Sequence, residues 1–145
     1  MLKKICLLLV SFFAIASQTS AQDITDGRNY FSFINDVNYT MTASPVTSEQ
    51  EFNKDINCGC PVVVMFTASW CGPCKMIFPY FCSHASSYPT AAFIYVDVNQ
   101  LNEVAEGQGI KNLPTFKMYK DGLVLDTVIG ANRQALESMI QSHIN

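Results

Sequence analysis

Two apolar runs stand out in the hydrophobic pattern of this 145-residue chain. Residues 61–68 and 92–98 are short and rich in β-branched and aromatic side chains, which is typical of buried strands. Between them, residues 75–87 are predicted to form one helix. Two strands joined through a single helix form a βαβ unit, so we expect the two strands to be parallel.

Polar positions predict two further short helices. Ser48 followed three residues later by Glu51 is a capping box, and it predicts a helix that ends near Ile56. Residues 57–60 form a loop before the first apolar run, and residues 101–106 are predicted to form another short helix. The two helices therefore flank the predicted βαβ unit in the sequence.

The C-terminal third predicts a hairpin and a last helix. Asp121-Gly122 separates the apolar runs 115–119 and 123–129, and Asp-Gly between such runs is a hairpin signal. Asn132 is a helix cap, and the helix after it carries one apolar face. That face consists of Ala135, Leu136, Met139 and Ile140. The order helix, strand, helix, strand, helix, hairpin, helix predicts a three-layer α/β sandwich.

The N-terminus has the pattern of an export signal. Lys3 and Lys4 precede the apolar residues 5–16, and small residues follow up to Ala21. The apolar run is shorter than the roughly 17–25 residues that span a bilayer, so we expect cleavage after Ala21 rather than a membrane anchor. This predicts a secreted or otherwise extracytoplasmic protein.

The signal divides the chain into three predicted parts. Residues 1–21 are the signal, and residues 22–45 are an extension that is poorly ordered or loosely packed. Residues 46–145 are one domain, long enough to bury a core. Without Lys3 and Lys4, the chain carries 7 basic and 12 acidic residues, a net charge of −5. This balance argues against nucleic acid and membrane surfaces as partners.

Cys71-Gly72-Pro73-Cys74 lies between the first strand and the helix after it. A helix N-terminus stabilises a thiolate, which is the attacking species in disulfide exchange. A C-x-x-C pair can also be half of a zinc site, but His84 and His143 stand alone and no second pair has ligand spacing. We therefore expect a redox site with no metal and no cofactor.

The order of the two cysteines predicts their roles. Cys71 comes first, where the helix field is strongest and solvent access is expected to be best, so it is the predicted nucleophile. Cys74, one helical turn later, is the predicted resolving thiol that attacks the mixed disulfide at Cys71. Gly72 and Pro73 set the balance between the reduced and oxidised pair, and proline removes an N–H donor near the sulfur.

Residues 46–144 resemble the thioredoxin family, closer to its eukaryotic members. The resemblance implies a thioredoxin-like three-layer α/β/α sandwich with a central mixed sheet. It also implies a protein-disulfide reductase that acts on disulfide-containing proteins and takes electrons from a reductant such as a thioredoxin reductase. The motifs that carry it are Val62-Val63-Val64, Ala68-Ser69-Trp70-Cys71-Gly72-Pro73-Cys74-Lys75, Val96-Asp97-Val98, Leu113-Pro114-Thr115-Phe116, Lys120-Asp121-Gly122 and Gly130-Ala131-Asn132.

The resemblance also implies a substrate-binding surface. It makes the Leu113–Pro114 bond cis, places it against the active-site cysteines, and leaves nearby backbone groups to pair with an extended substrate. Each of the other residues assigned to this surface has ordinary packing as its alternative. They are Trp70, Val98, Leu113, Ile129, Gly130 and Ala131.

One position departs from the family pattern. Met65 stands where thioredoxins usually place a buried acid, and Tyr95 stands where that acid usually has a lysine partner. The acid helps to move the proton of the resolving thiol, which methionine cannot do. We therefore expect Cys74 to react without an internal base, using water or the leaving thiolate.

Cys6 is expected to leave with the signal, and the other three cysteines leave alternatives open. Cys58 and Cys60 can pair with each other in a C-x-C disulfide, or one thiol can link two chains. Cys82 on the active-site helix is a packed thiol or a third candidate for such a link. The chain is therefore expected to be a monomer, with a disulfide-linked dimer through Cys58, Cys60 or Cys82 as the alternative.

Two alternatives to a reductase follow from the predicted export. In an oxidising compartment, the same pair can serve as a disulfide oxidase or isomerase. The second alternative is a redox-inert secreted interaction module on the same fold, which the intact Cys71 and Cys74 argue against. The reduction potential of this pair separates these functions.

Overall fold

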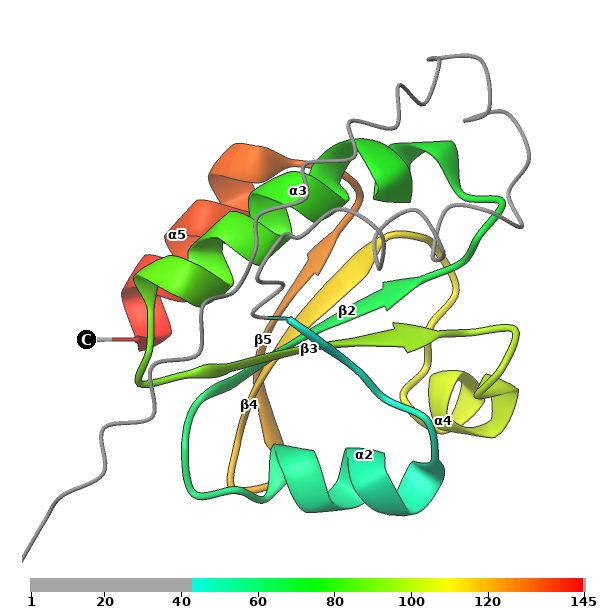
Figure 1. The fold of residues 1–145 in the computed structure, drawn as a ribbon, viewed down its shortest axis with the longest axis horizontal. Helices are drawn as coiled ribbons and strands as arrows, with labels where there is room; N and C mark the ends of the chain where they lie inside the picture. Colours follow the sequence, from blue (N-terminus) through cyan, green and yellow to red (C-terminus); the bar gives the residue numbers. More distant parts are fainter. Residues whose placement is uncertain (1–42, 145) are drawn as a thin grey trace, which may run out of the picture.

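A computed structural model describes residues 43–144 (Figure 1). The predicted signal and residues 22–42 of the predicted extension lie outside the described residues. Within residues 43–144, no helix has the length and apolar character needed to cross a membrane. The elements are β1 (Ser44–Pro45), α2 (Glu49–Ile56), β2 (Val62–Thr67), α3 (Gly72–Ser87), β3 (Ala92–Asp97), α4 (Asn102–Gly107), β4 (Thr115–Lys120), β5 (Leu123–Ile129) and α5 (Arg133–His143).

The strands form one mixed sheet in the order β1-β3-β2-β4-β5. The predicted parallel pairing of the first two apolar runs is confirmed, because β2 and β3 pair in parallel. β4 and β5 form the predicted hairpin, and β4 pairs with β2 in the antiparallel sense. These pairings confirm the predicted α/β fold with a central mixed sheet.

The sheet begins earlier than the sequence predicted. Ser44 and Pro45 pair in parallel with β3, and the Val46 N–H donates to the Tyr95 carbonyl at 3.0 Å. Ala43 is buried in the core. A two-residue strand shows no alternation of polar and apolar side chains, so the sequence pattern placed the boundary at residue 46 instead.

Helices cover both faces of the sheet, as Figure 1 shows. One apolar cluster packs side chains of α3 and α5 against Val63 and Met65. The other packs side chains of α2 and α4 against Val62, Val64 and Phe66. This two-sided cover explains why every residue of β2 is buried and why its sequence is apolar up to the last residue, Thr67.

The predicted caps are present with one change. The Glu51 N–H donates to Ser48 Oγ at 3.1 Å, and the Ala135 N–H donates to Asn132 Oδ1 at 3.0 Å. The Glu51 carboxylate accepts instead from the backbone N–H and the hydroxyl of Thr47, both at 2.7 Å. These two bonds lower the pKa of Glu51. The capping box therefore includes the residue before Ser48.

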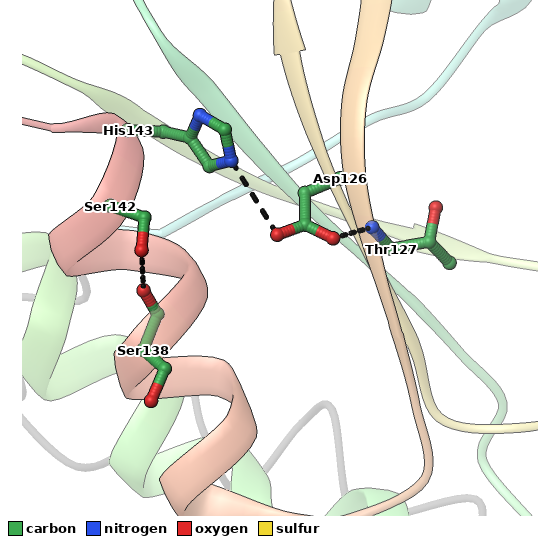
Figure 2. Close-up of polar contacts among 5 residues, drawn as sticks. All are labelled: Asp126, Thr127, Ser138, Ser142 and His143. Atoms are coloured by element: carbon green, nitrogen blue, oxygen red, sulfur yellow. Dashed lines mark hydrogen bonds and ion pairs between the residues drawn. The ribbon is translucent and has the colours of Figure 1, made fainter.

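The β4–β5 turn and the end of α5 are fixed by specific contacts. Asp121 and Gly122 have φ values of 50° and 77°, the left-handed region that an Asp-Gly hairpin turn uses. Farther along β5, Asp126 Oδ2 lies 3.5 Å from His143 Nε2 in the last turn of α5 (Figure 2). The same carboxylate accepts from the Thr127 N–H at 2.7 Å. The contact between Asp126 and His143 joins the end of α5 to β5, the edge strand of the sheet.

Candidate active site

The cysteine pair lies where β2 passes into α3. Cys71 is the N-cap of α3, and its sulfur accepts the Cys74 N–H with an N···S distance of 3.2 Å. Cys71 and Cys74 form a disulfide with Cα atoms 5.3 Å apart. A sulfur that caps a helix N-terminus faces unpaired N–H groups and the positive end of the helix dipole. Both features stabilise a thiolate at Cys71 once the bond is reduced.

Both cysteines of the pair are buried. Cys71 is 4% exposed and Cys74 is 1% exposed, and both belong to the same apolar cluster as Met65 and Ile77. The expected order of accessibility holds, with Cys71 the more accessible of the two. A partner must therefore approach closely at the Cys71 side of the bond.

Exposed apolar side chains flank the pair. Trp70 is 68% exposed, and its indole N–H donates to Asn99 Oδ1 at 3.5 Å. Met76, in the second turn of α3, is 75% exposed. Water-facing apolar side chains beside a reactive bond provide area for binding a protein partner. Sequence reasoning missed Met76 and Asn99 as site residues, because neither has a spacing signal that reveals its exposure.

The other predicted binding residues lie at one end of the sheet. Thr67 pairs with Asp97, while Phe66 pairs with Thr115 and Thr115 pairs with Ile129. Strand ends that are register partners lie level with one another, so the loops next to them lie at the same edge of the sheet. These loops, together with the ends of the strands, carry Trp70, Val98, Leu113, Ile129, Gly130 and Ala131.

Exposure divides these residues into two groups. Ile129 is 62% exposed and Ala131 is also exposed, as a binding surface requires. Val98 and Leu113 are half-buried and pack against both apolar clusters. They therefore contribute to the core as well as to this end of the sheet.

The Leu113–Pro114 peptide bond is cis. Pro114 is buried, and its carbonyl accepts the Gly130 N–H at 2.7 Å. The Thr115 hydroxyl donates to the Asn112 carbonyl at 2.7 Å. The loop before β4 is thus joined to the residue after β5, at the end of the sheet that also carries Cys71.

The structure places Met65 directly beside Tyr95. The two residues are register partners on β2 and β3, and Met65 is fully buried. Burial is the main reason that the pKa of the Tyr95 phenol is raised, and the nearby Cys82 adds to the shift. A protonated phenol at neutral pH is no base for Cys74. The pair that usually combines an acid and a lysine is therefore a thioether and a phenol here.

The other cysteines of the described residues, Cys58, Cys60 and Cys82, bear on the alternatives left by the sequence. Cys58 and Cys60 form an intrachain disulfide with Cα atoms 5.4 Å apart. Cys82 is buried, and burial raises the pKa of its thiol to about 11. Neither arrangement presents a thiol for linking two chains, so the alternative of a disulfide-linked dimer has no support. Within residues 43–144, no group of three or more His, Cys, Asp or Glu side chains is placed to hold a metal ion.

Comparison with known proteins identifies this arrangement. The family model described as Thioredoxin matches residues 43–142. The chain belongs to the thioredoxin family. Thioredoxin 1 of Plasmodium falciparum is 44% identical over 98 residues, which cover 68% of this chain and 94% of that protein. Thioredoxin H1 of Arabidopsis thaliana is 46% identical over 83 residues, 57% of this chain and 73% of that protein.

Solved thioredoxin structures share the fold. A structure of Plasmodium falciparum thioredoxin matches with a TM-score of 0.68 and 42% identity, covering 70% of this chain and 99% of that one. Fasciola hepatica thioredoxin matches with a TM-score of 0.67 and 36% identity, covering 69% and 98%. The predicted fold and enzyme class are confirmed: the chain is a thioredoxin-type protein-disulfide reductase. Thioredoxins act on disulfide-bonded proteins and are reduced by thioredoxin reductase.

The comparisons correct the predicted location. The relatives include H-type thioredoxins of Oryza sativa and Chlamydomonas reinhardtii and a thioredoxin of Schizosaccharomyces pombe. This set points to an intracellular location, so the prediction of a secreted protein is wrong. That prediction depended on the basic, apolar and small residues of the segment 3–21, which precedes the matched region.

Proposed function

We propose that this chain reduces protein disulfides through the Cys71–Cys74 pair, with Cys71 as nucleophile and Cys74 as resolving thiol. The position of Cys71 as the N-cap of α3, with its sulfur accepting the Cys74 N–H, is the observation that carries the proposal. The more exposed residue of the pair is also the one whose sulfur the helix N-terminus stabilises as a thiolate. Both requirements of an attacking thiol therefore meet at Cys71.

The reaction has two exchange steps. The Cys71 thiolate attacks one sulfur of the substrate disulfide, which forms a mixed disulfide and releases the other substrate sulfur as a thiolate. Cys74 then loses its proton and attacks Cys71 Sγ, which releases the second substrate sulfur and forms the Cys71–Cys74 disulfide. Two electrons pass to the substrate, and a thioredoxin reductase restores the dithiol.

The substrate binds across the exposed apolar surface around the pair. Trp70, Met76 and Ile129 supply exposed apolar area, and Ala131 extends it. Leu113, Pro114, Val98 and Gly130 shape the adjoining loops. Gly72 and Pro73, both exposed at the start of α3, tune the balance between the dithiol and the disulfide.

Insulin reduction tests the nucleophile. The purified chain, supplied with dithiothreitol, should reduce insulin disulfides, and Cys71→Ser should lower the rate to that of dithiothreitol alone. Cys82→Ser is the matched control, because Cys82 lies on the same helix but in neither disulfide. Activity that survives in Cys71→Ser would refute the assignment.

Adduct trapping tests the resolving thiol. Cys74→Ser retains the first attack and loses the second, so mixed disulfides with substrate should accumulate on non-reducing gels. Mass mapping should place these adducts on Cys71. If Cys74→Ser forms no more adducts than the wild-type chain, another group resolves the intermediate.

A further inference from the structure

A second disulfide lies in the loop between α2 and β2. Cys58 and Gly59 are exposed, while Cys60 is half-buried against the cluster beneath α2. Gly59 has a φ of +79°, and a Cβ atom built there would meet nothing within 4 Å. The outer side of this bond is therefore open to an approaching molecule, unlike the buried pair at Cys71 and Cys74.

The two disulfides lie at opposite ends of β2, one in the loop before the strand and the other at the start of α3. Figure 1 shows this loop and the start of α3 at the two ends of β2. Cys60 comes two residues before the strand, and Cys71 follows four residues after its end. Six strand residues at roughly 3.3 Å each separate the two ends by about 20 Å. Direct exchange within one molecule is therefore excluded, and any exchange at Cys58–Cys60 involves a second molecule.

The loop is held in place without help from the disulfide. The Cys58 N–H donates to the Asp55 carbonyl at 3.2 Å, and the Gly122 N–H of the β4–β5 turn donates to the Ile56 carbonyl at 2.9 Å. The Lys120 ammonium group donates to the Gly59 carbonyl. A bond between residues two apart constrains the unfolded chain little, because that effect grows with loop length. A purely structural role therefore explains this bond poorly.

The surroundings favour one sulfur as a leaving group. The Cys60 N–H points at Cys58 Sγ with an N···S distance of 3.3 Å. This matches the contact between the Cys74 N–H and Cys71 Sγ, at 3.2 Å. The positive charge of Lys120 lies beside the same loop. An N–H donor and a nearby cation both stabilise a thiolate, so Cys58 can leave a mixed disulfide as an anion.

We propose that Cys58–Cys60 is a second thiol–disulfide site, reduced by the Cys71–Cys74 dithiol of a second copy of this chain. The proposal rests on the proposed function for its electron donor. The donor Cys71 thiolate attacks Sγ of the exposed residue Cys58, the Cys58–Cys60 bond breaks, and Cys60 leaves as a thiolate that takes up a proton.

Donor Cys74 then loses its proton and attacks donor Cys71 Sγ, which releases acceptor Cys58 as a thiolate. The backbone N–H of acceptor Cys60 stabilises this thiolate. The donor ends with a Cys71–Cys74 disulfide and the acceptor with two reduced cysteines. Two electrons are transferred, and the protons lost by the donor balance those gained by the acceptor.

The test uses two variants of the full chain. The acceptor carries Cys71→Ser and Cys74→Ser with Cys58–Cys60 oxidised, and the donor carries Cys58→Ser and Cys60→Ser with its dithiol reduced and free reductant removed. After mixing, the samples are alkylated and mapped by peptide. Alkylation of acceptor Cys58 and Cys60 should rise as alkylation of the donor Cys71–Cys74 pair falls. The rate should exceed that with equal dithiothreitol by roughly tenfold or more, because a stabilised thiolate attacks faster at neutral pH.

Two controls make the outcome decisive. A donor that also carries Cys71→Ser should transfer nothing. Oxidised wild-type chain serves as a second acceptor in case the double variant does not fold, because chymotryptic cleavage after Phe66 separates the two pairs for mapping. The inference is overturned if the donor reduces insulin but leaves Cys58–Cys60 oxidised, or reduces Cys58–Cys60 no faster than dithiothreitol does. The proposed function stands in both cases. A donor that does neither overturns both.

Discussion

The two disulfides share one contact and differ in their surroundings. In each pair, the second cysteine donates its backbone N–H to the sulfur of the first. Cys71 is buried and begins α3, whereas Cys58 is exposed and follows the end of α2. A helix dipole favours an anion at its N-terminus and opposes one at its C-terminus. The same local hydrogen bond therefore supports two sites of different acidity and access.

This difference separates two requirements of an exchange site. The Cys71 end provides the field that makes a strong nucleophile, with exposed apolar side chains for binding a partner. The Cys58 end provides an open disulfide without such a field, which suits an acceptor of electrons better than a donor. Lys120 beside Gly59 supplies part of the positive charge that the helix end does not.

Met65→Asp should produce the largest change, and it acts at the Cys71 end only. A buried carboxylate with a raised pKa can accept the Cys74 proton, so the mixed disulfide should decay faster in rapid-mixing experiments. Replacing a fully buried methionine with an ionisable group should cost about 2–5 kcal/mol of the free energy of unfolding.

Met65→Asn is the matched control, because it has the shape of aspartate without a base. It should lose comparable stability with no gain in rate. Decay in Met65→Asp that is no faster than in the wild-type chain, with the fold intact, would show that the missing acid does not limit resolution.

Gly122→Ala should disturb the Cys58 end instead. A Cβ at Gly122 would come within 2.6 Å of Asn57 Oδ1, and the φ of +77° is unfavourable for alanine. We expect a loss of about 1–2 kcal/mol in urea unfolding, with insulin reduction unchanged. Gly107→Ala in α4 is the control, since its Cβ would meet nothing within 4 Å. Equal effects of the two substitutions would contradict the role assigned to the turn.

Alkylation of the fully reduced chain compares the two ends directly. Exposure favours Cys58, while the helix N-terminus favours Cys71. A helix N-terminus stabilises a thiolate and a helix C-terminus destabilises one, and the two effects together amount to about 1–2 kcal/mol. Cys71 should therefore react with iodoacetamide roughly tenfold faster than Cys58 at pH 7. Mass mapping of quenched samples measures both rates. Faster labelling of Cys58 would mean that access outweighs the helix field.

The smallest expected effect is a pH dependence at the far end of α3. Burial lowers the pKa of His84, against a smaller opposing effect of Glu137, and His84 Nε2 is buried with no hydrogen-bond partner among the described residues. The folded state therefore binds a proton less readily than the unfolded state, whose histidine pKa is about 6.5. Stability should fall as the pH drops below about 6.5 toward the lowered pKa.

Urea unfolding at two pH values measures this effect. His84→Gln should reduce the loss of stability between pH 7.5 and pH 5.5 relative to the wild-type chain. The other groups that titrate in this range remain in the variant, so the difference between the two chains isolates His84. An identical pH dependence in both chains would rule out a contribution from His84.

Much of the fold followed from local patterns. The apolar runs gave β2 and β3 to within one residue at each end, Asp121-Gly122 gave the hairpin, and Ser48 and Asn132 gave two helix starts. Each signal lies within a few neighbouring residues, so the sequence displays it directly. β1 escaped prediction because its two residues are defined only by pairing with β3.

The site was predicted less completely than the fold. The spacing of Cys71 and Cys74 and the helix after them indicated thiol–disulfide chemistry, and the family comparison confirmed the class. The burial of Cys71 and the exposure of Met76 did not follow from the pattern, because a side chain's exposure depends on which distant elements cover it. The prediction of export failed because it depended on composition outside the matched domain.

By itself, the sequence determined which segments form strands and helices and which cysteines can form small rings. These properties depend on side chains a few residues apart, whose relative positions are set by backbone geometry. Only the tertiary structure decided that Met65 lies beside Tyr95, thirty residues later in the chain, and that the two disulfides lie at opposite ends of one strand. Sheet register and packing between layers set those distances, because they join residues whose separation along the chain carries no information about their separation in space.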